Sequence, residues 1–434
     1  MDCGSAAPWG LEDVPGAGRG VVARHALRAG ELVLSVPRAQ WWPCAEEARK
    51  AILGRLVGEP PKIDADDISD EAAVGLWLLA ERQLCEASPH AASVGAVPDV
   101  VDTVLQWSDD EMAELEGSSF FVAAATLREE TGVEFEALSN DPVWSGFMSG
   151  LECNRERFFW AKATVLSRQV TIQIPGHESE GSMTAVIPGH DYLNHESYCP
   201  NCEFEILGDA APVLVVRCVR DIAAGEECRI CYGPVPNSSL LILHGFITDA
   251  NPFDCVEFTL ECPSMPDAKL EWLRALQEVA RGQEDHAAPK VFQLVEEPGA
   301  GMPLTTLHLL SEKLPLPRTF LGTIRLLLLH VDALGVLERE EARATLCCGP
   351  GELRLPGLPA ASARAVEDAA LRLAAERLGA MRASCAAAAG EGSAVPAASG
   401  RRRLAAAAVS HGEQRILDAA LAELREAADR LDSE

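Results

Sequence analysis

The sequence lacks long apolar runs and any excess of basic residues. Its densest apolar run, residues 326–329, lies between Arg325 and His330 and is far shorter than the roughly 18 residues that a membrane helix needs. The 37 Lys and Arg residues face 66 Asp and Glu residues, which gives a net charge of −29. Phosphate binding needs a basic face. We therefore expect neither a membrane nor a nucleic acid as partner, and a monomer as the default state.

Regular cysteine spacing is also missing. The 14 cysteines follow no repeated interval, which indicates reduced thiols. The first residues, MDCGSAAPWGLEDVPG, lack the basic start and apolar core of a signal peptide, and their acids fit a transit peptide poorly. We expect a cytoplasmic or nuclear protein, with the plastid left open. The acidity itself fits ordinary solubility or a basic partner protein.

A phrase that predicts strands and turns occurs twice. Residues 18–42 read GRGVVARHALRAGELVLSVPRAQWW and residues 215–233 read VVRCVRDIAAGEECRICYG. Each has an apolar strand, then Leu27 or Ile222, then Ala-Gly-Glu, then another strand. Two copies do not make a repeat protein, so we expect two similar hairpin-like units in one small β-fold.

Helical patterns occupy most of the remaining chain. Residues 70–84 and 107–117 both predict helices, the second with Ser108 as its cap. After Phe253 the sequence is rich in Ala, Leu, Glu and Arg, and Leu417, Leu421 and Leu424 form one buried stripe. Residues 386–409, with GEGSAVPAASGRRR, predict a flexible loop in that region.

The stretch IPGHDYLNHESYCPNCEFEI (187–206) has the residue types of a metal site. Cys199 and Cys202 form a C-x-x-C pair, and Cys228 and Cys231 form another, with 25 residues between Cys202 and Cys228. Cys228 and Cys231 fall in an apparent strand, however, where residues i and i+3 point to opposite faces. We therefore favour free cysteines that pack as small hydrophobes, and expect no metal.

Three common enzyme signatures are absent or out of context. The sequence has no phosphate-binding P-loop motif and no G-x-S-x-G nucleophile elbow. GAGRG (16–20) is similar to a dinucleotide-binding glycine loop, but a β-run follows it where a helix would be required.

Four blocks together resemble the SET-domain protein methyltransferases. They are GRGVVARHALRAGELVLSVPR (18–38), WSDDEMAELEGS (107–118), FFWAKATVLSR (158–168), and the pair IPGHDYLNH (187–195) with AGEECRICYGPVPNSSLLILHGFI (224–247). The match is to the branch that contains the Rubisco large-subunit lysine methyltransferase and the actin-histidine methyltransferase. Order and separation agree over nearly the whole chain, including the helical tail SHGEQRILDAALAELRE (410–426).

The resemblance implies an α+β architecture in two domains. Residues 1–252 would form the SET domain, with a β-rich core from 16–44 and 150–252 split by a helical insert at 45–149. Residues 253–434 would form an all-α domain that binds the protein substrate. The resemblance also implies S-adenosylmethionine as methyl donor and a non-histone protein as substrate.

The resemblance also implies site residues. Tyr232, in CYGP, matches the family's active-site tyrosine. The expected cofactor contacts are Ala17, Gly18, Arg19, Arg168, Asp191, Asn194, His195, Gly245 and Phe246. The expected substrate contacts are Ser167, Asp191, Phe204 and His244. Methyl transfer needs a neutral nucleophile held in line, which is mainly a matter of positioning.

Each of these assignments has a plainer alternative. Tyr232, His195 and Phe246 would also suit a hydrophobic core, Arg168 a strand end at the surface, and Asp191 a turn. Phe204 and His244 stand where the plant lysine enzyme has further tyrosines. Losing those hydroxyls leaves three functions open: a lysine methyltransferase, which we favour, a histidine methyltransferase, and an inactive SET protein that serves as a binding module.

Overall fold

The computed structural model describes residues 7–56, 61–177, 181–262, 265–281, 292–295, 304–334, 346–355, 359–388 and 397–433. The described chain forms two compact units. The N-terminal unit contains the residues up to Ser108, Ala123–Gly233 and Ser239–Pro252, and the C-terminal unit contains Asp109–Val122, Pro234–Ser238 and the residues from Phe253 on. The domain boundaries expected from the sequence stay a prediction.

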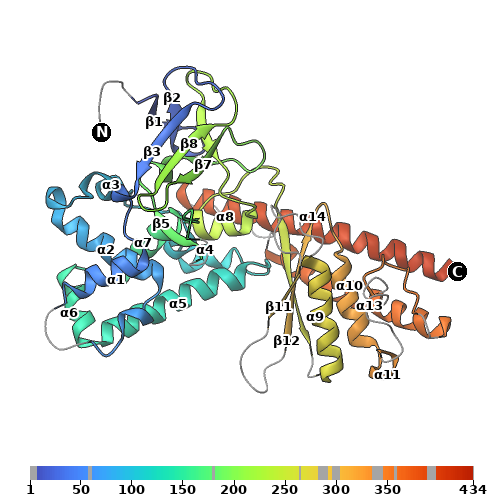
Figure 1. Ribbon diagram of the computed structural model, residues 1–434. Coiled ribbons are helices and arrows are strands. Elements are labelled where there is room, and N and C mark those ends of the chain that lie inside the picture. The colour runs from blue at the N-terminus through green and yellow to red at the C-terminus, as the bar shows by residue number, and fades with distance from the viewer. Residues whose placement is uncertain are drawn as a thin grey trace. The chain divides into compact units, whose positions relative to one another are not determined.

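The N-terminal unit combines three small sheets (Figure 1). Their orders are β1-β2-β9-β6, β3-β8-β7 and β4-β5. All neighbours are antiparallel except β6 and β9. The strands are β1 (Trp9–Val14), β2 (Gly18–Ala23), β3 (Leu32–Pro37), β4 (Gln169–Ile172), β5 (Met183–Val186), β6 (Asn194–His195), β7 (Cys202–Leu207), β8 (Val213–Cys218) and β9 (Glu227–Ile230).

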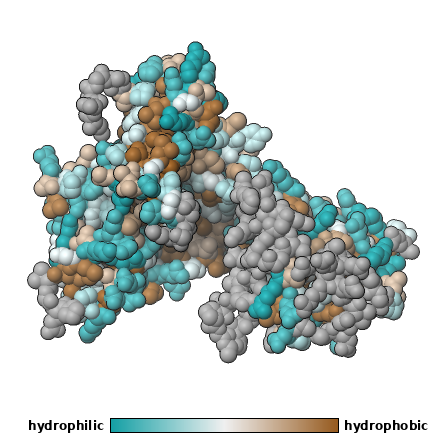
Figure 2. Space-filling view, viewed as in Figure 1, coloured by the Kyte–Doolittle hydropathy of each residue, from teal (hydrophilic) through white to brown (hydrophobic). Residues whose placement is uncertain are grey.

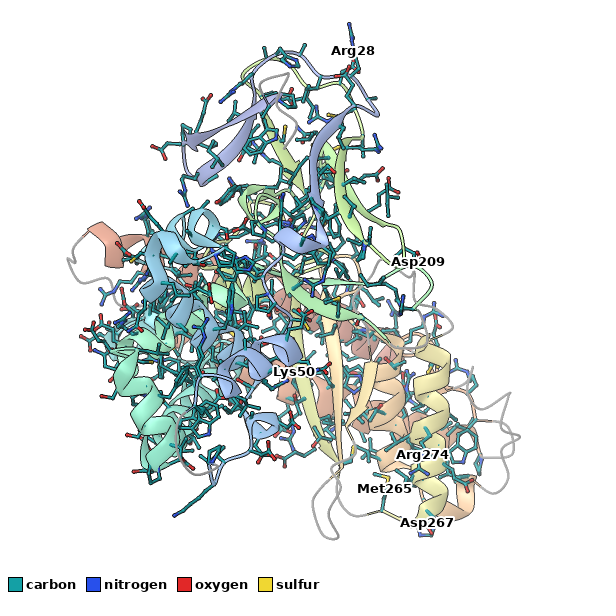
Figure 3. The ribbon with its side chains drawn as sticks, turned by 60° about the vertical axis from the view of Figure 1, so that its left-hand side comes forward. Arg28, Lys50, Asp209, Met265, Asp267 and Arg274 are labelled. Carbon is teal, nitrogen blue, oxygen red and sulfur yellow. The ribbon has the colours of Figure 1, made fainter. Side chains whose placement is uncertain are left out.

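The two similar phrases of the sequence pack against each other. Strand β3 of the first phrase pairs with β8 of the second, and β2 pairs with β9. Leu27 and Ile222, the matching residues of the two phrases, exchange two backbone hydrogen bonds of 2.9 Å. Arg28 projects from the turn after Leu27 (Figure 3) and forms an exposed ion pair with Asp221. The strands within each phrase lie in different sheets and do not pair with each other, so the prediction of hairpin-like units is wrong, although both phrases contribute to the same β-rich unit.

Helices cover residues between β3 and β4 as the sequence predicts. They are α1 (Ala45–Leu53), α2 (Asp70–Leu84), α3 (Ala91–Gly95), α4 (Asp109–Ala113), α5 (Phe121–Asn140), α6 (Pro142–Gly150) and α7 (Arg155–Leu166). The hydroxyl of Ser69 caps α2 by accepting a hydrogen bond from the Ala72 amide. Helices α2 and α7 pack together around Leu76, Trp77 and Phe158, and α7 delivers the residues that follow it to the site.

The C-terminal unit is largely helical but contains a sheet. After α8 (Asn237–His244), most of which belongs to the N-terminal unit, the elements are β10 (Cys255–Cys262), α9 (Asp267–Arg281), β11 (Phe292–Val295), β12 (Leu304–Ser311), α10 (Arg318–Leu328), α11 (Val331–Leu334), α13 (Ala360–Ala388) and α14 (Ala397–Ser433). The strands pair antiparallel in the order β10-β12-β11. The α+β class is confirmed, whereas the expectation that this region is all-α is wrong. Alternate residues of β10 are buried, which stabilises a strand.

The region predicted as a flexible loop is helical at both ends. Helix α13 extends to Ala388 and α14 begins at Ala397, so the loop prediction is wrong for these residues, and 389–396 lie outside the described residues. Alanine has the highest helix propensity, which outweighs the single Gly400. The predicted leucine stripe is confirmed, because Leu417 and Leu424 are buried and Leu421 packs against the same core.

Apolar side chains at the surface are scattered. The most exposed are Val122, Tyr198 and Leu404, from separate elements, and Figure 2 shows hydrophilic and hydrophobic residues interspersed on the visible face. Among the described helices, none combines the length and the hydropathy that crossing a membrane would require.

Candidate functional site

Three rings surround the predicted catalytic tyrosine. The centroid of Tyr232 lies 5.0 Å from that of His195, 5.1 Å from His244 and 6.3 Å from Phe246. The Tyr232 hydroxyl donates a 2.8 Å hydrogen bond to the Leu193 carbonyl. Burial raises the pKa of the Tyr232 phenol, and the nearby Asp191 carboxylate raises it further. The phenol therefore stays protonated at neutral pH and acts as a hydrogen-bond donor.

The end of α8 places His244 and Phe246 beside this tyrosine. Gly245 follows the last helical residue with φ +78° and donates its amide to the Leu241 carbonyl at 3.1 Å. A left-handed residue at this position is how many helices end, and glycine adopts it without strain. A Cβ on Gly245 would also lie 2.3 Å from the Asp102 carbonyl oxygen. Glycine is therefore required here on two counts.

A buried ion pair is formed by Arg168 and Asp191, which lie close in the sequence to Ser167 and His195. Arg168 follows α7 and its Nη1 lies 3.3 Å from Asp191 Oδ2. The other carboxylate oxygen of Asp191 accepts a 2.8 Å bond from the Gly189 amide, so the acid also closes its own turn. Burial raises the pKa of Asp191, and the Arg168 guanidinium opposes that rise. The Nε of Arg168 is buried and has no partner among the described residues.

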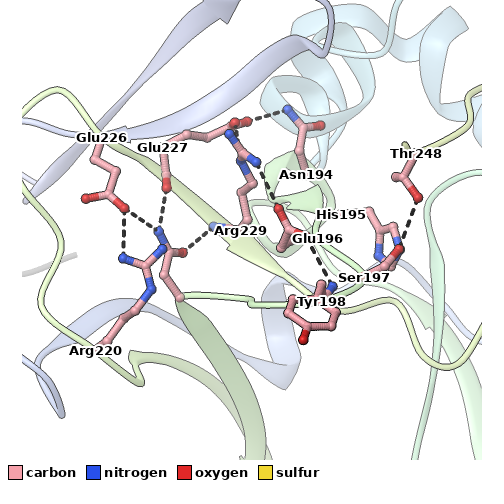
Figure 4. Close-up of polar contacts among 11 residues, drawn as sticks. Asn194, His195, Glu196, Ser197, Tyr198, Arg220, Glu226, Glu227, Arg229 and Thr248 are labelled. Atoms are coloured by element: carbon pink, nitrogen blue, oxygen red, sulfur yellow. Dashed lines mark hydrogen bonds and ion pairs between the residues drawn. The ribbon is translucent and has the colours of Figure 1, made fainter. Parts of the chain in front are cut away.

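Asn194 belongs to a polar network centred on Glu227 (Figure 4). Its Nδ2 donates to Glu227 Oε1 at 2.7 Å and to the Arg19 carbonyl at 3.2 Å. Arg229 completes the network through Glu227 at 2.7 Å and Glu196 at 3.1 Å. The Glu227 side chain is only 6% exposed. A buried carboxylate needs such partners, so this network fixes β6 against β2 and β9.

His195 is held in one tautomer by its neighbours. Its Nδ1 accepts a 3.0 Å bond from the Tyr232 amide, so the proton is on Nε2, which lies 2.8 Å from the Ser197 hydroxyl. Ser197 in turn contacts the Thr248 hydroxyl at 3.1 Å, as Figure 4 shows. Burial, with a smaller contribution from His244, lowers the pKa of His195 to about 4. The neutral ring thus fixes the backbone of Tyr232.

The glycine turn predicted to contact the cofactor lies between β1 and β2. Ala17 donates its amide to the Val14 carbonyl at 3.1 Å, and Gly18 has φ +75° with open space where a Cβ would be. Arg19 lies over the Tyr192 ring at 5.7 Å and donates to the Ala96 carbonyl at 2.8 Å. Arg19 is thus linked to Asn194 through its own carbonyl, whereas the described residues show no hydrogen bond from Ala17 or Gly18 to the other predicted site residues.

Ser167 and His244 contact each other at the ring cluster, whereas the ring of Phe204 contacts another residue. The Ser167 carbonyl accepts a 3.1 Å bond from His244 Nδ1, which joins α7 to α8. Phe204 has its ring contact with His190, at 4.7 Å and 79°. Both nitrogens of the buried His190 lack partners among the described residues, and burial lowers its pKa to about 4.

Sequence reasoning missed Glu227, Arg229, His190 and the Leu193 carbonyl. Glu227 carried no usable signal, because alternation along GEECRI places it with Arg229 on the face opposite to Cys228 and Ile230. The other contacts depend on tertiary structure. The Leu193 carbonyl accepts from a residue 39 positions away.

The cysteines of the suspected metal site differ in burial. Cys202, Cys218 and Cys228 are buried in the β-core, whereas Cys199 is exposed and Cys231 donates to the Gly233 carbonyl. Within the described part of the chain, no group of three or more His, Cys, Asp or Glu side chains has the geometry to hold a metal ion.

Sequence comparison matches much of this site to a known domain. Residues 18–233 match the SET domain. The chain is 24% identical over 256 residues to the chloroplastic fructose-bisphosphate aldolase lysine N-methyltransferase of Arabidopsis thaliana, covering 57% of this chain and 49% of that protein. It is 22% identical over 253 residues to the chloroplastic Rubisco large subunit N-methyltransferase of Nicotiana tabacum, covering 56% and 48%. The chain spans about half the length of these curated relatives.

Solved structures agree over the whole fold. The SET domain of LSMT, the Rubisco large-subunit methyltransferase, bound to MeLysine and AdoHcy has a TM-score of 0.70 at 19% identity, covering 99% of this chain and 90% of that one. Rubisco LSMT bound to AdoMet has a TM-score of 0.69 at 19% identity, covering 99% and 89%. This chain therefore contains a SET domain at residues 18–233 and has the fold of the Rubisco large-subunit methyltransferases.

Proposed function

We propose that this protein transfers a methyl group from S-adenosylmethionine to a lysine side chain of a non-histone protein. The observation that carries the proposal is the placement of Tyr232 among His195, His244 and Phe246, with its hydroxyl directed to the Leu193 carbonyl. The relatives named above act on aldolase and Rubisco by their names, which supports a non-histone protein as substrate.

The residues present suit such a methyl donor. The buried Nε of Arg168 has no partner among the described residues and is a free cationic donor for a carboxylate. Asn194 holds the Arg19 backbone in place, and Gly18 leaves its backbone open to a close approach. We assign cofactor binding to these residues, with Asp191 orienting the Arg168 guanidinium and Phe246 offering an apolar face.

Methyl transfer depends on positioning of the reactants more than on acid–base groups. The donor supplies a methyl carbon on a sulfonium. The lone pair of a neutral lysine amine forms the new N–C bond, the C–S bond breaks, and its electron pair stays on sulfur. The methylated ammonium then releases one proton to solvent. Because free lysine has a pKa of about 10.4, a desolvated site that disfavours the ammonium form assists this reaction.

A histidine acceptor is the second candidate. Phe204 contacts His190 and carries no hydroxyl, and His244 stands beside Tyr232, so this part of the site lacks phenol groups that would orient an amine. The identity of the methylated amino acid separates the two candidates.

For the compartment, the cytoplasm, the nucleus and the plastid stroma all keep thiols reduced, and the names of two relatives place those proteins in the chloroplast.

Calorimetric titration of the purified chain with S-adenosylmethionine tests the proposal. We expect saturable binding, weakened about tenfold or more by Arg168→Ala, which corresponds to about 1.4 kcal/mol. Arg28→Ala is the matched control, since Arg28 forms only a surface pair whose side chain is 77% exposed, and its affinity should equal that of the wild type. Absence of saturable binding by the folded wild-type protein would contradict the enzyme proposal and favour a binding module.

A further inference from the structure

His244 has one ring nitrogen in use and one available. Its Nδ1 lies 3.1 Å from the Ser167 carbonyl, which can only accept, so Nδ1 carries the proton. In the neutral ring Nε2 is then an unprotonated acceptor. No hydrogen bond to this Nε2 is formed by the described residues. The ring is the last residue of α8 and is anchored by Gly245 behind it, so Nε2 has a fixed direction.

This nitrogen belongs to the ring cluster around Tyr232. The His244 centroid lies 5.1 Å from Tyr232 and 6.0 Å from Phe246. The groups around the His244 ring are the Tyr232 phenol, the neutral His195 ring and, on Nδ1, the Ser167 carbonyl. Arg168 beside Ser167 is paired with Asp191. Burial lowers the pKa of His244 below its usual 6.5, which the bond to Ser167 only partly offsets. The imidazole is therefore neutral at physiological pH.

We propose that Nε2 of His244 is the hydrogen-bond acceptor for an N–H of the substrate lysine amine. This inference rests on the proposed function, because it assumes a lysine in the site. A neutral imidazole nitrogen accepts one N–H and turns the amine lone pair toward the methyl donor. Protonation of Nε2 would remove the acceptor and add a positive charge that repels an ammonium. Binding of the lysine amine is therefore sensitive to acid.

Nitrogen NMR of protein labelled with ¹⁵N-histidine tests this inference without methyl transfer. The His244 signals are assigned by their loss in His244→Gln. We expect the Nδ1–H tautomer in the free protein. We also expect a shift of the Nε2 resonance on addition of Nα-acetyl-lysine methylamide at about pH 10, where much of the amine is neutral. A ring protonated on Nε2, or an Nε2 signal unmoved when the other site signals are saturated, overturns the proposal.

Variants separate a hydrogen-bonding role from a structural one. His244→Gln puts an amide oxygen near the position of Nε2 and should keep the affinity for the lysine probe within about threefold. His244→Phe keeps the ring but not the acceptor and should weaken it by about tenfold. His25→Gln, in an exposed turn, is the control and should change nothing. Equal affinities for the Gln and Phe variants would contradict the role of Nε2.

Failure of the function and failure of the inference give different results. If S-adenosylmethionine does not bind, the enzyme proposal fails, whereas the tautomer and the amine-dependent shift of His244 stand on their own. If the cofactor binds but the His244 ring is protonated on Nε2, only the inference is lost.

Discussion

At the scale of single residues, the strongest constraint is on the buried carboxylate of Glu227. Asn194→Ala removes one hydrogen bond to it, which should reduce the free energy of unfolding by about 1 kcal/mol. Asn194→Asp instead places a second carboxylate where Nδ2 lies 2.7 Å from Glu227 Oε1. That variant should lose about 3 kcal/mol at neutral pH, because a buried charge is left without compensation.

Denaturant unfolding at two pH values checks this prediction. The introduced carboxylate has a raised pKa in the folded state, so its destabilisation is full above that pKa and is relieved as the pH falls through it. The gap between Asn194→Asp and Asn194→Ala should therefore narrow at acidic pH. A gap that stays constant would mean that Glu227 is not buried against Asn194.

A second prediction at this scale concerns His190. Its pKa in the folded protein is about 4, below the usual 6.5, because of burial. The unfolded chain therefore takes up a proton first, and stability falls as the pH drops from the usual value to the folded value. His190→Leu should remove up to about 3 kcal/mol of this acid-induced loss. Urea unfolding measured across this pH range tests it, with His25→Leu as the exposed control. An unchanged pH slope in His190→Leu would show that the ring is already hydrated.

At the scale of elements, the end of α8 decides how the site is assembled. Gly245→Ala meets both a left-handed backbone and an Asp102 oxygen 2.3 Å from the new Cβ. Gly225→Ala meets a φ of +83° but nothing within 4 Å. Gly225→Ala serves as the control, and its free energy of unfolding should fall by about 1 kcal/mol from backbone strain alone. The free energy of unfolding of Gly245→Ala should fall by about 2 kcal/mol more, and this substitution should displace His244 and Phe246. Equal melting temperatures would contradict this close approach.

The helices and strands show how much of the secondary structure can be predicted from local sequence patterns. Helix α2 begins and ends where the sequence predicts, because Ser69 caps it and its apolar spacing is regular. The strand β10 was missed although its burial alternates, because the surrounding Ala- and Leu-rich sequence suggests helices. Helix α14 extends through the expected loop since alanine stabilises a helix despite Gly400. Boundaries set by tertiary packing are not visible in a local window.

The residues of the site were likewise only partly predictable from the sequence. Asn194, Arg168, Asp191 and Tyr232 were predicted from a family resemblance, and the structure gives each a defined partner, although their roles stay predictions. Single residues such as His190 gave no signal, because its buried ring depends on its contact with Phe204 on β7. Resemblance therefore identified the positions, whereas the tautomers of His195 and His244 required the fold.

At the scale of the whole molecule, we predict a protein whose stability does not depend on zinc. Cys202, Cys218 and Cys228 lie in the β-core, and the hydrogen bond with Cys228, together with burial, raises the pKa of Cys202. Protonated thiols are poor metal ligands. Elemental analysis should find far less than one zinc per chain, and a chelator should leave the melting temperature unchanged. One equivalent of zinc, with a lower melting temperature in the chelator, would contradict the free-cysteine interpretation.

The central claim is tested most directly by transfer of labelled methyl from S-adenosylmethionine into a protein extract, followed by complete hydrolysis. Tyr232→Phe is run beside the wild type, because it removes only the hydroxyl that contacts Leu193. We predict label in methyl-lysine, reduced about a hundredfold in the variant, since small losses of positioning have large effects on rate. Label in methyl-histidine would contradict the lysine assignment, and equal transfer by both proteins would contradict the role of Tyr232.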